Sequence, residues 1–142
     1  MIKTIFNPGS YPNNIHLVLF LLRVVVGAFM LTHGSGKFST LFGDEPITFA
    51  DPIGIGEPAS LVLAVFAEVL CSILLIFGIA TRLATIPLII TMLVAVLIVH
   101  ANDGFDHKEL PLFYLVVYLS LTITGAGKIS MDHWIYQKIN RI

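Results

Sequence analysis

Four long runs of hydrophobic residues dominate the sequence, and short polar segments separate them. A helix needs about 20 apolar residues to cross a hydrocarbon core about 30 Å thick. The runs cover residues 15–33, 59–78, 83–102 and 110–127. Only two charged residues fall inside them, Arg23 in the first run and Glu68 in the second. We therefore predict an all-α fold, a membrane-embedded four-helix bundle that forms one domain over residues 1–142.

The segments between the runs differ in length and chemistry. Residues 34–58 form the longest connection, which mixes Gly, Pro and acidic residues with large apolar ones. This outer loop either folds over the mouth of the bundle as a lid or is a loosely ordered connector. Residues 130–142 place Trp134, Ile135 and Ile139 on one helical face, which predicts a short helix in the membrane interface.

Composition supports the membrane assignment. The 142 residues are 56% hydrophobic and only 12% charged, whereas a soluble domain carries about 25% charged residues. The mean hydropathy is +0.90, which excludes a water-soluble monomer. A single Cys excludes an intramolecular disulfide and a cysteine-cluster metal site. The net charge of -1, without a Lys/Arg cluster, argues against nucleic acid as a partner.

Lys and Arg are distributed unequally between the two sides of the predicted bundle. On the side of both termini lie Lys3, Arg82, Lys128, Lys138 and Arg141, against only Lys37 and Lys108 on the other. The positive-inside rule then predicts that the N- and C-termini are both cytoplasmic.

The two charges inside the predicted spans lie at similar depth. Arg23 is about 12 Å from the cytoplasmic start of its helix and Glu68 about 14 Å from the outer start of its own, at 1.5 Å per residue. Because each alone would be an uncompensated charge, we predict an Arg23–Glu68 ion pair. The pair either sets helix docking or handles substrate or protons.

Histidines gather at the predicted outer boundary. His33 ends the first span and His100 the third, and His107 and Tyr114 lie near the start of the fourth. They are either interfacial residues that contact water and headgroups, or a shared polar site able to pass protons. A haem or copper ion at His33 and His100 is a weaker alternative because HxxH-type spacing is absent, and we predict no metal site.

One face of the fourth span carries hydroxyls and small residues, namely Tyr114, Tyr118, Thr122 and Gly125. Such a face either packs between helices or lines a cleft for an aromatic head group such as a quinone. Cys71 has no second thiol as a partner, which excludes CxxC-type redox chemistry within this chain.

Several of these motifs together resemble the DoxX family. The resemblance rests on Arg23 with Gly27, His33-Gly34, Lys37, Glu68, Thr81-Arg82, His100, Glu109 and the run Gly127-Lys128-Ile129-Ser130-Met131-Asp132. It implies a multi-pass, four-helix protein of a prokaryotic cytoplasmic (inner) membrane. It also implies an association with oxidoreductase systems, such as thiosulfate:quinone oxidoreduction or thiol stress.

We therefore expect a membrane component of a quinone-linked oxidoreductase. The expected catalytic residues are Glu68, His33, His100 and Arg23, and the expected quinone contacts are Tyr114, Tyr118 and Lys37. Electrons would come from a soluble or membrane oxidoreductase partner. The alternatives are a small transporter gated by the Arg23–Glu68 pair, and a non-catalytic assembly or anchoring subunit. Small-residue faces on several spans are compatible with a homodimer.

Overall fold

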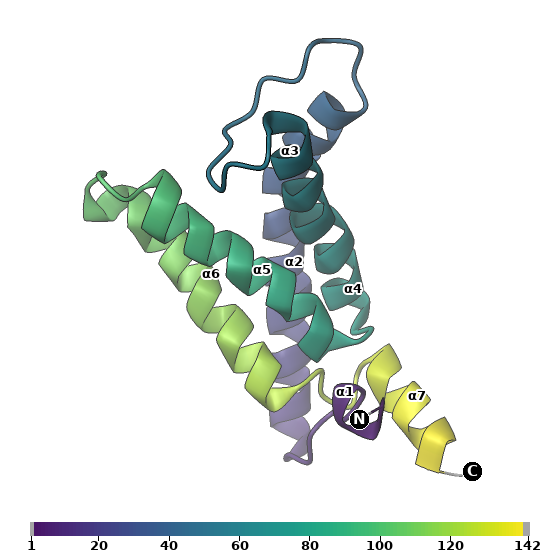
Figure 1. Cartoon of the computed structure of the whole chain (residues 1–142). Coiled ribbons are helices and arrows are strands. Elements are labelled where there is room, and N and C mark those ends of the chain that lie inside the picture. Colours follow the sequence, from purple (N-terminus) through teal and green to yellow (C-terminus); the bar gives the residue numbers. More distant parts are fainter. Residues whose placement is uncertain (1, 141–142) are drawn as a thin grey trace.

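The computed structural model describes residues 2–140, and all secondary structure within them is helical. The elements are α1 (Ile2–Ile5), α2 (Asn13–Leu41), α3 (Glu57–Val65), the π-helix η1 (Phe66–Cys71), α4 (Ser72–Phe77), α5 (Thr81–Val94), the π-helix η2 (Ala95–Val99), α6 (Phe105–Thr124) and α7 (Met131–Asn140). The segments α3, η1 and α4 form one continuous rod, and α5 continues into η2. Figure 1 shows these two rods beside α2, with α6 alongside α5.

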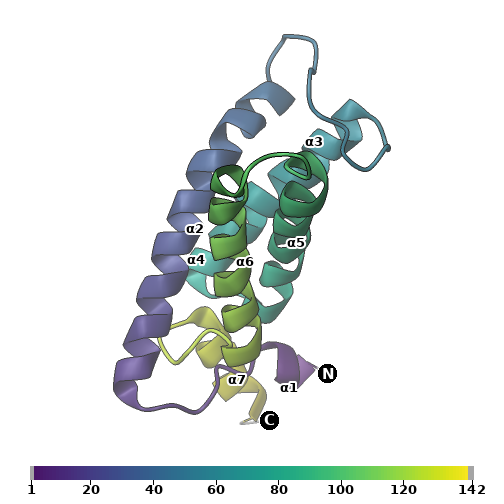
Figure 2. The same ribbon diagram turned by 90° about the vertical axis from the view of Figure 1, so that its left-hand side faces the viewer.

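Three of these rods are long and apolar enough to cross a membrane: Asn13–Leu41, Glu57–Phe77 and Thr81–Val99. They correspond to the first three predicted spans. The fourth run forms most of α6, which has 20 residues but carries Asp106, Lys108 and Glu109 near its start. A membrane crossing by α6 therefore stays a prediction, although α6 packs against α5 within the same bundle (Figure 2).

Helix α2 extends beyond its predicted end at His33, so the predicted outer loop over residues 34–58 is wrong at its start. The helix continues through Gly34 and Gly36 to Leu41, and the connection covers residues 42–56. Gly34 faces η1 closely, because a Cβ at this position would lie 3.0 Å from the backbone carbon of Glu68. Gly34 thus allows two helices to approach each other and does not end the first.

The predicted Arg23–Glu68 ion pair is wrong. The buried guanidinium of Arg23 donates hydrogen bonds to the carbonyl oxygens of Leu75 (3.0 Å), Ile76 (3.2 Å) and Ile129 (2.5 Å). Leu75 follows Glu68 by seven residues on the same rod, a separation of about 10 Å. The last carbonyls of a helix carry partial negative charge. Arg23 is therefore stabilised by hydrogen bonds at the end of α4 and in the turn after α6.

Asp132 fastens the same end of the bundle. Its carboxylate accepts hydrogen bonds from the backbone N–H of Ala80 (2.6 Å) and Thr81 (2.9 Å), which caps the start of α5. Its own N–H donates to the carbonyl of Gly78 (2.8 Å). Arg23 and Asp132 thus join the turn after α6 to the connection between the second and third rods.

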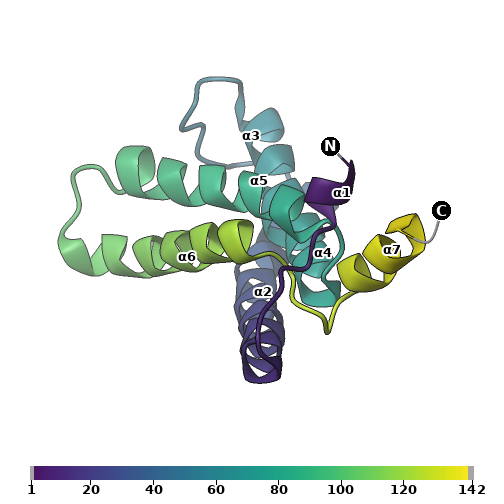
Figure 3. The same ribbon diagram turned by 90° about the horizontal axis from the view of Figure 1, so that it is seen from below.

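The two ends of the described chain lie at the same end of the bundle, as Figures 1 and 2 show. Helix α1 lies at that end of the bundle (Figure 1). The predicted tail helix is present as α7, which extends sideways from the bundle when it is viewed from below (Figure 3). The last two residues of the predicted tail, 141 and 142, lie outside the described residues.

Replacement of Arg23 by Met is expected to destabilise the fold. It removes one hydrogen bond from each of three carbonyl oxygens, and a buried acceptor left without any partner costs about 1–3 kcal/mol. The Leu75 carbonyl keeps its bond from the Gly78 N–H. We expect an apparent melting temperature lower by several degrees. The assay is thermal unfolding in mild detergent, followed by reaction of a thiol-specific dye with Cys71, which is buried. Lys128→Met, which removes an exposed cation from the nearby turn, serves as the control. An unchanged melting temperature for Arg23→Met would contradict this role.

Candidate functional site

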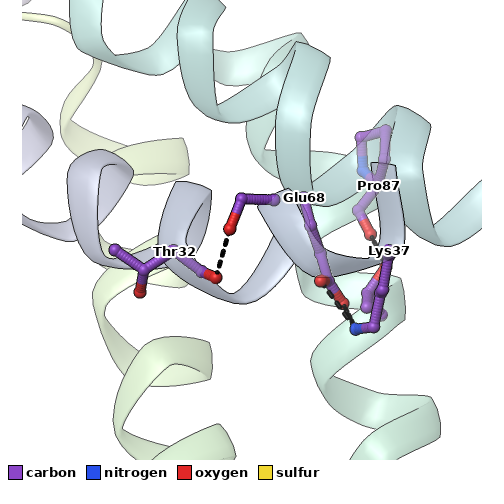
Figure 4. Close-up of polar contacts among 6 residues, drawn as sticks. Thr32, Lys37, Glu68 and Pro87 are labelled. Carbon is purple, nitrogen blue, oxygen red and sulfur yellow. Dashed lines mark hydrogen bonds and ion pairs between the residues drawn. The ribbon is translucent and has the colours of Figure 1, made fainter. Parts of the chain in front are cut away.

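Glu68 forms a buried ion pair with Lys37 toward the end of the bundle opposite the chain termini, which is the predicted outer end (Figure 1). The Nζ atom of Lys37 lies 2.5 Å from Oε1 and 2.6 Å from Oε2 of Glu68 (Figure 4). The Glu68 side chain is 4% exposed and that of Lys37 is 31% exposed. A carboxylate this deeply buried needs a counter-charge. Lys37 supplies it, because α2 continues for one further turn beyond His33.

The ion pair lies in the wall of a cavity of about 380 Å³, which we call the outer cavity. Five of the seven predicted site residues line it: His33, Lys37, Glu68, His100 and Tyr114. The other lining residues are Met30, Met92, Ala95, Asp106, His107, Leu110 and Pro111. The structure therefore brings together residues of α2, η1, the end of η2 and α6, as the sequence analysis expected of a shared polar site.

The other two predicted site residues lie outside this cavity wall. Arg23 is at the opposite end of the bundle and bonds to backbone carbonyls. Tyr118 is completely buried one turn below Tyr114, and the two rings stack with centroids 5.9 Å apart. Tyr118 therefore supports the ring of Tyr114 from below.

Aromatic and acidic neighbours orient the histidines of the cavity. The ring of His33 meets that of Tyr114 edge to face, with centroids 6.0 Å apart. The rings of His100 and His107 stack at 6.0 Å. Nδ1 of His100 lies 2.7 Å from Oδ2 of Asp103, and this hydrogen bond is the main reason why the pKa of Asp103 lies below its ordinary value.

Each π-helix positions a residue that lines the outer cavity. Glu68 lies within η1, and η2 begins at Ala95 and ends directly before His100. A π-helical turn adds a residue to the helical repeat, which rotates the following side chains, and such turns are frequent at functional sites. Hydrophobic periodicity contains no signal for this change, so the sequence analysis missed it.

A second cavity of about 320 Å³ lies beneath the loop over residues 42–56. We call it the loop cavity. The loop contributes Phe49, Ala50, Pro52 and Ile53 to its wall. Lys37, Glu68, Ala95 and His100 line both cavities. Of the two sequence interpretations, a cover over the mouth of the bundle therefore describes this loop better than a loose connector does.

Asp51 holds the loop to the start of α3. Its carboxylate accepts hydrogen bonds from the Ser60 hydroxyl (2.7 Å) and from the backbone N–H of Gly56 (2.8 Å) and Ile55 (3.0 Å). The bond from Ser60 is the largest cause of the lowered pKa of Asp51. The sequence analysis did not identify this residue, because Asp51 lies six residues before α3 and is not in the N-cap position that the sequence pattern would reveal.

In residues 2–140, no three His, Cys, Asp or Glu side chains come together as a metal site would require. The protonatable side chains of the outer cavity instead lie beside methionine, proline and alanine. The arrangement suits an uncharged, partly apolar molecule that accepts hydrogen bonds.

Replacement of Lys37 alone is expected to lower the free energy of unfolding more than replacement of Lys37 and Glu68 together. Lys37→Met leaves a buried carboxylate without a partner, which costs about 3–5 kcal/mol, whereas apolar replacement of both partners is often nearly neutral. We therefore expect Lys37→Met to melt at a lower temperature than the Lys37→Met/Glu68→Leu double variant in the same dye assay. Equal melting temperatures would show that the pair is not electrostatically coupled.

The attachment of the loop is expected to weaken in acid. Since folding lowers the pKa of Asp51, its contribution is complete above the ordinary Asp value of about 3.8 and is lost as the pH falls through the lower, folded value. Hydrogen exchange of peptides spanning residues 47–56, corrected for intrinsic rates, should therefore accelerate only below about pH 4. Asp51→Asn should exchange faster than the unmodified protein above about pH 4, and the difference should disappear in acid. A pH-independent loop in the unmodified protein would contradict the assignment.

Comparison with known proteins identifies the family. The DoxX family model matches residues 18–101, a segment that contains Lys37, Glu68 and His100. An uncharacterized protein of Haemophilus influenzae is 33% identical over 132 residues, with 84% of this chain and 92% of the relative covered. The Bacillus subtilis protein named "Putative oxidoreductase CatD" is 28% identical over 118 residues, with 82% of this chain and 86% of the relative covered.

No solved structure matches the chain. The family match covers more than half of the sequence. Except for the first residues of α2, it includes all three helices that are long and apolar enough to cross a membrane. The chain is a membrane protein that belongs to the DoxX family.

Proposed function

We propose that this protein is the membrane component of a quinone-linked oxidoreductase and that the outer cavity binds the quinone head group. The observation that carries the proposal is the convergence of Lys37, Glu68, His33, His100 and Tyr114 on one cavity in an apolar bundle. A few convergent polar groups in a mainly apolar cavity are typical of a small-molecule site. The volume of about 380 Å³ lies within the usual range for such sites.

The chemistry of the cavity fits quinone reduction. A quinone takes up two electrons and two protons, one proton on each carbonyl oxygen, to become a hydroquinone. Histidine titrates near neutral pH, and the Lys37 ammonium and the Tyr114 hydroxyl are hydrogen-bond donors. In this proposal His33 and His100 transfer protons, Lys37 and Tyr114 hold the carbonyl oxygens, and Glu68 positions the Lys37 ammonium. The electrons come from a partner protein that carries a reduced redox cofactor.

The name of the Bacillus subtilis relative supports an oxidoreductase role. The proposal includes a prokaryotic cytoplasmic membrane with both chain ends on the cytoplasmic side, which places the cavity near the outer surface. A sulfur-compound or thiol-stress reaction for the partner follows from the family resemblance. Arg23 has no catalytic part in this proposal, because its guanidinium bonds to carbonyls at the opposite end.

One observation favours a carrier as a second candidate. The Lys37–Glu68 pair stands between the outer cavity and the loop cavity and lines both, where a gate would stand. A carrier moves its substrate across a vesicle membrane without changing its redox state. Uptake of a labelled solute by proteoliposomes, without quinone, would therefore favour this candidate.

Binding of ubiquinone-1 by the detergent-purified protein tests the head-group site. We expect saturable binding, one molecule per chain, and about tenfold weaker binding by Tyr114→Phe, which removes one hydrogen bond. The matched control is Tyr136→Phe, the same change on α7 at the other end of the bundle. His33→Phe and its control His133→Phe form a second pair. Absence of saturable binding, or equal effects within each pair, would contradict the proposal.

A further inference from the structure

We infer that the loop cavity holds the apolar tail of the molecule whose head group occupies the outer cavity, so that the ligand is a long-chain prenylquinone. This inference rests on the proposed function and deepens it. It follows from the lining of the loop cavity, from the four wall residues that it shares with the outer cavity and from its position in the wall of the bundle.

The loop cavity offers a ligand almost only apolar surface. Apart from the four residues that it shares with the outer cavity, its wall consists of Phe49, Ala50, Pro52, Ile53, Ser60, Leu63, Ala64, Ile90, Thr91, Val94 and Val99. The two hydroxyls in this set already donate hydrogen bonds within the protein, that of Ser60 to Asp51 (2.7 Å) and that of Thr91 to the Pro87 carbonyl (2.9 Å). A hydrocarbon chain fits this wall, whereas a polar head group would be poorly satisfied there.

The two cavities meet at a defined place. Lys37, Glu68, Ala95 and His100 line both, so a single molecule can extend from one cavity into the other past these residues. Ala95 begins η2 and has a small side chain, which leaves room at this junction. A head group held by the protonatable residues would therefore direct its tail into the apolar cavity.

The loop cavity also lies against the lipid-facing surface. Leu63 of α3, Ile90 of α5 and Val99 of η2 line it, and they are 51%, 55% and 49% exposed. Their side chains thus contribute both to the cavity wall and to the apolar outer surface of the bundle. A tail longer than the cavity can continue between these rods into the hydrocarbon core.

The experiment compares ubiquinone-0, which has no tail, with ubiquinone-2, which has two isoprene units. Ala64→Phe places a larger side chain in the loop cavity, and Ala59→Phe is the matched control on an exposed position of α3 that lines neither cavity. We expect Ala64→Phe to weaken ubiquinone-2 binding about tenfold and to leave ubiquinone-0 binding unchanged. Ala59→Phe should change neither. Partition of the quinones into detergent does not affect the comparison, because the binding of each quinone is compared between variants in the same detergent.

A second variant shows whether misfolding explains a loss of binding by Ala64→Phe. Ala50→Phe fills the same cavity from the loop, where it does not disturb helix packing, and should reproduce the selective loss of ubiquinone-2 binding. Equal weakening of both quinones, or no effect on either, would overturn the tail assignment while leaving the head-group site in place. Failure of both quinones to bind the unmodified protein would overturn the proposed function and this inference together. A copurified phospholipid that is lost in Ala64→Phe, with ubiquinone-2 binding unchanged, would show an acyl-chain site instead.

Discussion

A carboxylate buried among apolar helices must be neutralised, and the contact between Glu68 and Lys37 meets this requirement. Three features of the structure make the contact. Helix α2 continues to Leu41, so that Lys37 lies one turn beyond His33 on the same helix. Gly34 lets α2 approach η1 closely, and η1 directs the carboxylate into the bundle. The outer cavity and the loop cavity both meet at this ion pair.

The opposite end of the bundle satisfies the same requirement in a different way. Arg23 is completely buried, and its guanidinium donates hydrogen bonds to carbonyl oxygens at the end of α4 and in the turn after α6. Arginine suits this position because its planar group serves several acceptors at once. One buried cation thus fastens helices together, while the other, Lys37, remains partly exposed beside a cavity. Partial exposure leaves Lys37 able to contact a ligand.

The sequence predicted that Arg23 and Glu68 are buried, but it predicted neither their partners nor the burial of Asp132. The four hydrophobic runs located the long helices. Because the first and third runs end on the side where the fourth begins, we expected His33, His100 and Tyr114 to lie together, and all three line the outer cavity. The Arg23–Glu68 pair was an error, because depth counted along two helices does not determine which faces meet. The first run was predicted to end at His33, whereas α2 continues and Gly34 packs closely against η1, a contact that only the tertiary structure reveals. The two π-helices leave no periodic signal, and the hydrogen bonds of Asp51 depend on the path of the loop.

The account makes the cavity beside Lys37 and Glu68 the place where a quinone binds. The most direct measurement is an experimental structure of the protein, in lipid, with ubiquinone-2 bound. We expect the quinone ring in the outer cavity, one carbonyl oxygen within hydrogen-bond distance of Tyr114 or His33, and the Lys37–Glu68 pair intact. A quinone ring bound outside this cavity, or a Glu68 carboxylate that pairs with a group other than Lys37, would contradict the account.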